Sequence, residues 1–124
     1  MTTSSLTASQ RDSLRVKLQQ QLLELGGELD SEREDARENV ESLRDSGVHD
    51  KGEESAANSV VAVDRAMIQQ HERQRAQVQA ALERLREERY GDCMKCGTAI
   101  GVERLMIEPS ASRCITCQED FESN

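Results

Sequence analysis

Apolar residues recur at helical intervals through the first third of the chain. Five leucines follow one another at steps of four, four, three and four positions: Leu14, Leu18, Leu22, Leu25 and Leu29. This spacing keeps their side chains on one face of a helix and is close to the coiled-coil period. The stripe continues more weakly through Ala36, Val40 and Leu43. Gly26-Gly27 interrupts it, and because two glycines cost about 2 kcal/mol against alanine in a helix interior, we expect a kink or a full break there.

A second helical stripe follows a segment that is typical of a turn. Asp45–Ser55 contains two glycines, several Asp and Ser residues and little apolar content. Ser55 or Asn58 is a suitable N-cap, and we expect the second helix to run from there to about Arg89. Its stripe comprises Val60, Val63, Met67, Gln70 or His71, Gln74, Val78, Ala81 or Leu82, and Leu85. We interpret its polar members as residues that set the register, since no second imidazole or carboxylate pattern indicates a metal site at His71.

All four cysteines lie in the last quarter of the chain, as Cys93, Cys96, Cys114 and Cys117. Each C-x-x-C pair can bring two thiolates to one tetrahedral ion, and Gly97 follows the first pair, where the backbone has to turn. The doubled pair predicts a structural Zn²⁺ site. Four cysteine ligands leave no position for water, so a catalytic zinc is not expected. The sequence also lacks a Gly-rich phosphate loop and a nucleophile–His–acid set, which argues against an enzyme and leaves a dithiol oxidoreductase as the enzymatic alternative.

These patterns predict a mainly α protein. Neither long helix can bury its stripe alone, so we expect a long antiparallel two-helix coiled-coil hairpin followed by a small four-cysteine zinc-finger module. The expected segments are a flexible N-terminus over 1–8, the hairpin over 9–89 with its tip near 45–66, and the zinc-finger module with a C-terminal tail over 90–124. Thr7 and Gln10 have the spacing of a capping box. Metal binding would supply folding free energy to a module that is too small for an adequate apolar core.

The chain is acidic, and its acidity is concentrated in one segment. Sixteen basic and twenty-four acidic residues give a net charge of −8, and residues 24–57 hold twelve of the acidic and four of the basic ones. A protein that binds the DNA backbone needs a positive surface, so direct DNA binding is not expected. The acidic segment is either a solvated helix face or an acidic prong for a basic or metal-lined cavity.

Two further absences in the sequence bear on location. No apolar run is long enough to span a membrane, and the N-terminus lacks the pattern of a secretion signal. We therefore expect a cytoplasmic protein. We also expect it to be a monomer. In that reducing compartment, paired cysteines bind metal more readily than they form disulfides.

The region around the cysteines resembles a known family. Tyr90-Gly91 precedes the pattern C-x2-C-G-x2-I-G-x2-R-L-x3-P-x4-C-x2-C, whose members are Cys93, Cys96, Gly97, Ile100, Gly101, Arg104, Leu105, Pro109, Cys114 and Cys117. This pattern is similar to that of the DksA/TraR zinc-finger family. The resemblance implies a protein that binds bacterial RNA polymerase directly, inserts its hairpin into the secondary channel, through which nucleotides enter, and modulates initiation without binding DNA.

Upstream, "VAVDRA" (Val61–Ala66) resembles the tip motif of that family, Asp-x-x-Asp-x-Ala. Asp64 and Ala66 match the motif, whereas Val61 replaces its first Asp. The resemblance implies that Asp64, with Arg65 and Ala66, acts near the polymerase active centre, where a carboxylate can meet basic channel residues or the catalytic Mg²⁺. The alternative for Asp64 is an acid in the first turn of the second helix, where the helix dipole favours it.

The resemblance also bears on control by guanosine tetraphosphate. Family members that respond to this alarmone carry basic residues late on the second helix, just before the Pro and just after the last Cys. Here those positions are Gln77 or Glu88, Glu108 and Gln118. Because a polyphosphate site needs Lys or Arg, we expect a weak response or none. The alternative to a polymerase regulator is a zinc-stapled coiled-coil interaction protein that does not act on RNA polymerase, as the Val61 replacement and the polar seam would allow.

Overall fold

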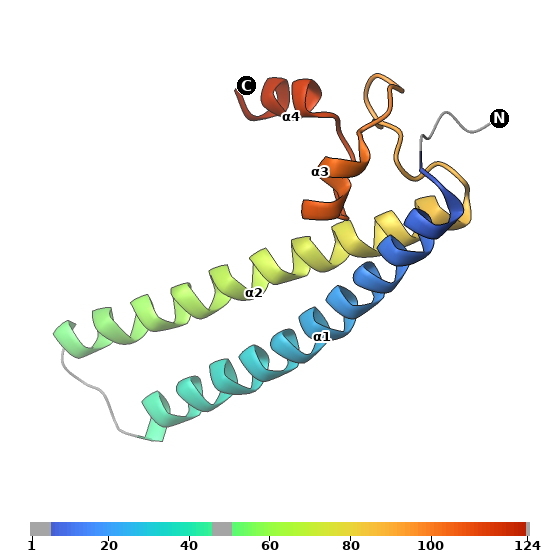
Figure 1. The fold of residues 1–124 in the computed structure, drawn as a ribbon. Coiled ribbons are helices and arrows are strands. Elements are labelled where there is room, and N and C mark those ends of the chain that lie inside the picture. Colours follow the sequence, from blue (N-terminus) through green and yellow to red (C-terminus); the bar gives the residue numbers. More distant parts are fainter. Residues whose placement is uncertain (1–5, 46–50, 124) are drawn as a thin grey trace. The chain divides into compact units, whose positions relative to one another are not determined.

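The computed structural model of the chain describes residues 6–45 and 51–123, with the side chains of all these residues except 43–45 and 51–61. Its regular structure consists of the helices α1 (Ala8–Asp45), α2 (Lys51–Arg86), α3 (Val102–Ile107) and α4 (Ile115–Ser123) (Figure 1). The described residues form no strand, only an isolated bridge between Asp92 and Ala99. Two long packed helices followed by a four-cysteine cluster confirm the predicted fold class. None of the described helices is both long and apolar enough to cross a membrane.

The chain forms two compact units. Unit 1 comprises Met1–Leu23 and Ala76–Asn124, and unit 2 comprises Glu24–Arg75. Unit 1 therefore contains the start of α1, the end of α2 and the cysteines. Unit 2 contains the rest of both long helices.

Unit 1 has an apolar core to which both long helices and the zinc-finger module contribute. The helices supply Leu14, Leu18, Val78, Ala81 and Leu85, and the module supplies Tyr90, Cys93, Ile100, Leu105 and Ala111. Leu14 and Leu18 have no exposed surface. Because burying one such side chain contributes about 1.5–3 kcal/mol, this core accounts for much of the stability of unit 1. The leucine stripe predicted for the first helix is confirmed here.

Polar contacts tie the module to the two helices within unit 1. The Tyr90 hydroxyl donates a hydrogen bond of 2.7 Å to the carbonyl oxygen of Pro109. Arg84 of α2 donates to the carbonyl oxygen of Ala111, and Lys17 of α1 donates to that of Met106. Arg84 and Lys17 thus join the long helices to backbone carbonyls of the module, whereas the Tyr90–Pro109 bond lies within the module.

Unit 2 is packed differently, because the α2 side of its seam is mostly polar. Among its described side chains, only Leu29 is fully buried. Val63 and Met67, which we expected in the seam, are 57% and 46% exposed, so that prediction was wrong. Apart from Glu72, the half-buried positions of α2 in unit 2 are instead spaced four, three and four apart, at Asp64, Ile68, His71 and Arg75. These positions extend the heptad spacing of Val78 and Leu85 toward the start of α2. Mostly polar residues therefore occupy the seam positions for which the apolar pattern had predicted Val63 and Met67.

The start of α1 agrees with the prediction, whereas its course through the glycine pair and the start of α2 differ from it. The capping box is confirmed: Thr7 N–H donates to Gln10 Oε1 at 2.9 Å, and Gln10 N–H donates to Thr7 Oγ1 at 3.1 Å. Helix α1 then runs unbroken through Gly26-Gly27, so a full break does not occur. Helix α2 begins at Lys51, before the expected caps, because the Glu and Ala residues that follow favour helix more than Gly52 opposes it. The remainder of the predicted turn, residues 46–50, and most of the predicted flexible N-terminus, residues 1–5, lie outside the described residues.

Helix α2 also ends earlier than expected, at Arg86 instead of Arg89. Glu88 has a φ of 60°, a left-handed conformation that is uncommon for residues other than glycine. The N–H of Arg89 donates to the carbonyl oxygen of Arg84 at 2.8 Å, and the N–H of Glu88 donates to that of Leu85 at 3.3 Å. This pair of bonds is a Schellman motif, which terminates a helix by satisfying its last carbonyl groups.

Candidate functional site

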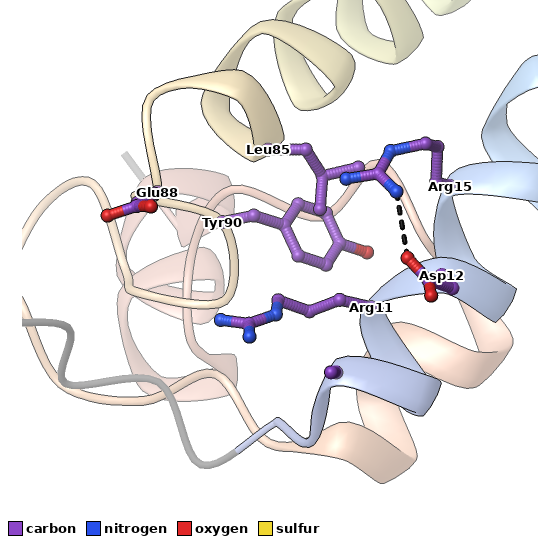
Figure 2. A pocket seen from close by; sticks show the side chains of 7 residues that line it. Arg11, Asp12, Arg15, Leu85, Glu88 and Tyr90 are labelled. Carbon is purple, nitrogen blue, oxygen red and sulfur yellow. Dashed lines mark hydrogen bonds and ion pairs between the residues drawn. The ribbon is translucent and has the colours of Figure 1, made fainter.

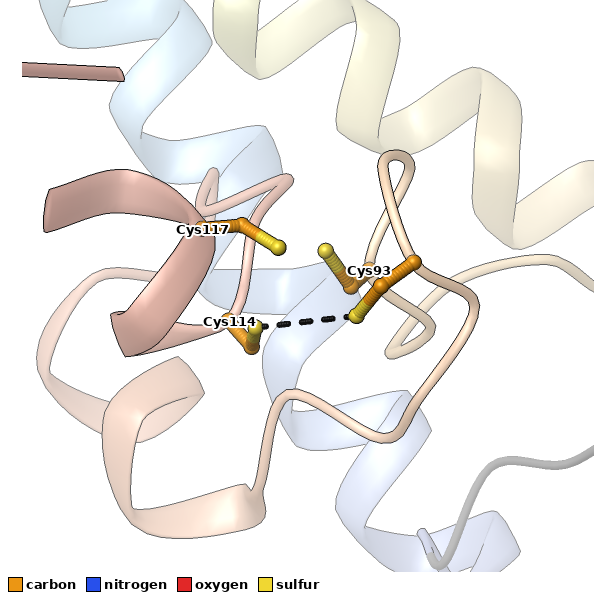
Figure 3. A group of neighbouring side chains, drawn as sticks. Cys93, Cys114 and Cys117 are labelled. Carbon is orange, nitrogen blue, oxygen red and sulfur yellow. Dashed lines mark hydrogen bonds between the residues drawn. The ribbon is translucent and has the colours of Figure 1, made fainter. Parts of the chain in front are cut away.

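The four cysteines form one compact cluster in unit 1. Their Sγ atoms all lie within 4.8 Å of one another, and those of Cys96 and Cys114 are 3.8 Å apart (Figure 3). Zn²⁺ binds cysteine sulfur at about 2.3 Å, so the sulfurs of a tetrahedral site lie about 3.8 Å apart. The cysteines form no disulfide. Both the donor set and the spacing therefore fit a closed Zn²⁺ site, which requires thiolate ligands and leaves no position for substrate.

Local backbone geometry positions both pairs of cysteines. In the first knuckle, Gly97 N–H donates to the carbonyl oxygen of Cys93 at 2.9 Å, and Cys93 N–H donates to that of Thr98 at 2.7 Å. Gly97 has a φ of +80°, so glycine is the residue that makes this turn without strain. In the second knuckle, Gln118 N–H donates to the carbonyl oxygen of Cys114 at 2.9 Å, where α4 begins.

The two knuckles are joined to each other by the backbone. Met94 N–H, in the first knuckle, donates to the carbonyl oxygen of Ser112 at 2.8 Å, two residues before the second cysteine pair. The bridge between Asp92 and Ala99 closes the base of the first knuckle. The sulfurs are thus brought together by backbone contacts from both sides of the cluster.

The environment of the sulfurs separates their acidities. Burial opposes ionisation of Cys93, but hydrogen bonds from the backbone of Cys114, Cys96 and Lys95 outweigh it and lower the pKa of Cys93 to about 6. Hydrogen bonding with the Thr98 hydroxyl, 3.0 Å away, lowers the pKa of Cys96. In contrast, hydrogen bonding to Cys114 raises the pKa of Cys117 to about 12. Four crowded thiolates repel one another, so full ionisation of the cluster requires a cation among them.

The proposed tip residues lie in unit 2. Asp64 is thirteen residues after Lys51, well inside α2, so it is not an acid of the first helical turn. Asn39 of α1 donates a hydrogen bond of 3.0 Å from Nδ2 to Asp64 Oδ2, which places this carboxylate in the seam. Arg65 and Ala66 are exposed. The Val61 side chain lies outside the described residues.

A shallow hollow of about 370 Å³ lies beside the Asp64 carboxylate. Its lining residues are Ala36, Asp64, Arg65, Ile68, Gln69 and Glu72. Asp64 and Arg65 therefore share one surface, whereas Ala66 does not contribute to it.

The positions that bear on alarmone binding lie in unit 1 and are not basic. Glu108 lies 3.9 Å from Arg104, and Gln118 donates a hydrogen bond to Glu122. Gln77 and Glu88 are exposed. The basic residues at the end of α2 have local partners: Arg84 donates to Ala111, Arg86 pairs with Glu83, and Arg89 pairs with Glu87. Burial lowers the pKa of Arg84, and its Nε has no hydrogen-bond partner among the described residues.

A cavity of about 220 Å³ that the sequence did not indicate lies where the start of α1 faces Tyr90 (Figure 2). It is lined by Ala8, Arg11, Asp12, Arg15, Leu85, Glu88 and Tyr90. Arg15 pairs with Asp12 at 2.8 Å, as the dashed line in Figure 2 marks. The two arginines are balanced by two carboxylates, so the cavity carries no net charge that would favour a polyphosphate.

Comparisons with known proteins agree with the site. Residues 88–123 match the family described as the prokaryotic dksA/traR C4-type zinc finger. The RNA polymerase-binding transcription factors DksA of Escherichia coli (strain K12) and Salmonella typhimurium are 31% identical over 77 residues. That match covers 53% of this chain and 51% of each relative, so it spans about half the length of these proteins.

The structural match extends over more of the chain. The structure of transcription factor DksA2 from Pseudomonas aeruginosa superimposes with a TM-score of 0.76 and 25% sequence identity. It covers 94% of this chain and 85% of that one. The likeness therefore includes the long helices as well as the cysteine module.

Proposed function

Because this chain belongs to the DksA/TraR family of zinc-finger proteins, we propose that it binds RNA polymerase directly and regulates transcription initiation. The observation that carries the proposal is the structural likeness to DksA2, which extends over 94% of the chain. A match confined to the zinc finger would leave the helices unexplained. We further propose that the protein is a cytoplasmic monomer, is not an enzyme and does not bind DNA in a sequence-specific way.

The zinc-finger module has a structural role in this proposal. Cys93, Cys96, Cys114 and Cys117 would hold Zn²⁺. The bound ion supplies charge compensation for four thiolates and folding free energy for the module. The module in turn closes the apolar core of unit 1, because Tyr90, Leu105 and Ala111 are buried there. Zinc thus stabilises unit 1 without taking part in any reaction.

Unit 2 is the part proposed to enter the secondary channel. Residues 24–75 hold fourteen acidic and seven basic residues, a net charge of −7 out of −8 for the whole chain. An acidic helical hairpin suits a channel that carries basic groups or a metal ion, since opposite charges steer association and set the register of docking. The hairpin shifts initiation only if it binds some conformations of the polymerase better than others.

The proposal also concerns which carboxylates of the hairpin would act on the polymerase. The resemblance assigns this role to Asp64, with Arg65 and Ala66. The Asn39–Asp64 hydrogen bond offers a second role for Asp64, in holding the seam. Glu53 and Glu54, by contrast, are at the third and fourth positions of α2. Both lie within Asp45–Ser55, the segment predicted as the turn of the hairpin. We therefore propose these glutamates as the second candidate pair.

One experiment separates the two assignments. Wild type, Asp64→Asn and the double variant Glu53→Gln/Glu54→Gln are compared for polymerase binding and for the lifetime of promoter complexes. Asp64→Asn keeps an oxygen that can accept from Asn39, so the seam is preserved while the charge is removed. Glu41→Gln, on the exposed face of α1, serves as the matched control.

The outcomes of that experiment are distinct. If Asp64→Asn binds but no longer changes the lifetime, Asp64 carries the effect. If only the double variant loses the effect, the acids at the start of α2 carry it. If the wild type does not bind polymerase, the alternative of a zinc-stapled coiled-coil protein with another partner replaces the proposal.

We also propose that guanosine tetraphosphate has little or no effect through this protein. The expected positions hold Gln77 or Glu88, Glu108 and Gln118, and the one cavity with two arginines described above is balanced by Asp12 and Glu88. Alarmone binding to the complex of this protein with polymerase tests the claim. Tight binding that requires this protein would contradict it.

A further inference from the structure

Unit 2 contains a cluster of three titratable side chains, Glu28, Glu32 and His71, which we name the histidine clasp. His71 Nδ1 lies 2.7 Å from Glu32 Oε1, and His71 Nε2 lies 3.6 Å from Glu28 Oε2. The His71 and Glu32 side chains are only 22% and 19% exposed, whereas Glu28 is 55% exposed. The two nitrogens of one imidazole ring on α2 therefore face two carboxylates on α1.

The protonation state of the ring decides whether both contacts are favourable. A protonated imidazole donates from both nitrogens, whereas a neutral one donates from one nitrogen and carries a lone pair on the other. The charge of a protonated His71 can thus pair with both carboxylates, with Glu32 2.7 Å from Nδ1 and with Glu28 3.6 Å from Nε2, the second distance being beyond a hydrogen bond. A neutral ring turns a lone pair toward one of them, and that carboxylate then loses its partner.

The surroundings of His71 favour the charged form. Hydrogen bonding with Glu32 is the main cause that raises the pKa of His71; partial burial opposes it, and the charges of Glu32 and Glu28 add to it. The contacts of His71 in the described part of the chain join α2 to α1. The nearby charged groups of α2 are Glu72, which pairs with Arg33 of α1 at 2.6 Å, and Arg75, which occupies the next seam position.

Apolar packing and further polar contacts also hold the two helices together at this place. Leu29 is the one fully buried side chain among those described in unit 2. Leu25, Ala36 and Ile68 are half-buried there, and polar contacts between the helices include the Asn39–Asp64 hydrogen bond and the Arg33–Glu72 ion pair. Since exposed ion pairs contribute little, the contact between His71 and Glu32, whose side chains are 22% and 19% exposed, is the better shielded ion pair of this seam.

We propose that the histidine clasp makes the pairing of α1 with α2 in unit 2 dependent on pH. As an imidazolium, His71 pairs with Glu28 and Glu32 across the seam. When His71 loses its proton, one of these ion pairs is lost and the pairing of α1 with α2 becomes less stable. The clasp holds its proton more tightly in the folded hairpin than in the unfolded chain. Its contribution is therefore fully present below the ordinary histidine pKa of about 6.5 and is lost as pH rises through the folded-state value. This property belongs to the free protein and does not depend on polymerase binding.

The first test is an NMR titration of the His71 ring in the zinc-loaded protein. His49, the other histidine of the sequence, lies outside the described residues, so a His49→Gln background leaves one imidazole to follow. We expect a titration midpoint above 6.5 that moves down when Glu32→Gln removes the nearer carboxylate. A midpoint at or below 6.5, or one that Glu32→Gln leaves unchanged, would overturn the proposal.

The second test measures the seam itself. Hydrogen exchange of the amides in residues 24–42 and 62–75 is followed between pH 5.5 and 8.5, after correction for intrinsic rates. For each pH unit by which the His71 titration midpoint exceeds 6.5, the wild type should lose about tenfold in amide protection as the pH is raised through that midpoint. His71→Gln, which does not titrate, should show a flat profile, and Glu24→Gln, an exposed acid of α1, should behave as the wild type.

Equal pH profiles for the wild type and His71→Gln would overturn the proposal. If His71→Gln does not fold, Glu32→Gln provides the same test. It should shift the loss of protection to lower pH, and an unshifted profile would contradict the clasp.

Discussion

Glu88→Gly should stabilise unit 1. Glu88 holds a left-handed backbone conformation, with φ at 60°, at the position of the Schellman motif that glycine usually occupies. A residue with a Cβ pays about 1–2 kcal/mol for this conformation, whereas glycine adopts it freely. Glycine in turn loses more conformational freedom on folding, by roughly 0.5–1 kcal/mol. The net expected gain is therefore about 0.5–1 kcal/mol in the free energy of unfolding.

Two further variants separate the backbone effect from that of the side chain. Glu88→Ala removes a carboxylate near a helix C-terminus, where negative charge is unfavourable by about 0.3–1 kcal/mol, but it keeps the strained backbone. Glu88→Gly should be the more stable of the two. Ala80→Gly, at an exposed position inside α2, is the matched control and should lose about 1 kcal/mol.

The assay is urea denaturation of the zinc-loaded protein, followed by tyrosine fluorescence. Tyr90 is the only tyrosine, the chain has no tryptophan, and its ring is 2% exposed in unit 1, so the signal reports on this unit. With a denaturant slope of about 1–3 kcal/mol per molar, the gain should raise the urea midpoint by roughly 0.2–1 M. A midpoint for Glu88→Gly at or below that of Glu88→Ala would refute the reasoning.

Three other changes have expected outcomes. Tyr90→Phe should lower the free energy of unfolding by about 1–3 kcal/mol, because it leaves the buried carbonyl of Pro109 without its donor; urea denaturation followed by circular dichroism checks this, since the variant has no tyrosine left to fluoresce. Burial raises the pKa of Tyr90 to about 12, so wild type should lose stability between pH 10 and 12 through this group, and Tyr90→Phe should lose less over that range. Removal of zinc with a chelator, or Cys96→Ser, should unfold the cysteine module and expose Tyr90, as measured by fluorescence and amide exchange. Gly27→Ala should stabilise α1 by about 1 kcal/mol in thermal unfolding, since the space around an added Cβ is open.

The sequence predicted the parts of the molecule that depend on short, strong patterns. The leucine stripe through Leu14, Leu18 and Leu29 identified the buried face of α1, because large apolar residues decide helix packing wherever they are available. The doubled C-x-x-C identified the metal cluster, since few arrangements other than a tetrahedral site use that spacing.

The seam of unit 2 could not be predicted in the same way. There, Val63 and Met67 are apolar but exposed, and Asp64, Ile68, His71 and Arg75 take the inner positions. These inner positions keep the heptad spacing of the better packed residues Val78 and Leu85. A prediction based on hydrophobicity misses them because most of them are polar. The pairing of His71 with Glu28 and Glu32 is likewise a contact between residues about forty positions apart, which spacing alone does not reveal.

The end of α2 shows a different limit. Its termination depends on a left-handed Glu88, and neither a glycine nor a proline marks this point in the sequence. The Schellman bonds and the Tyr90–Pro109 contact on the following segment stabilise that turn, so its position is decided by tertiary structure.

The most direct test of the proposed function is equilibrium binding of the zinc-loaded protein to purified core RNA polymerase from a bacterium. We expect saturable binding in one-to-one stoichiometry that weakens with rising salt, because an acidic hairpin with a net charge of −7 in residues 24–75 contributes to it. The same protein after zinc removal should bind less tightly. No saturable binding by the folded, zinc-loaded protein would contradict the proposal that it acts on RNA polymerase.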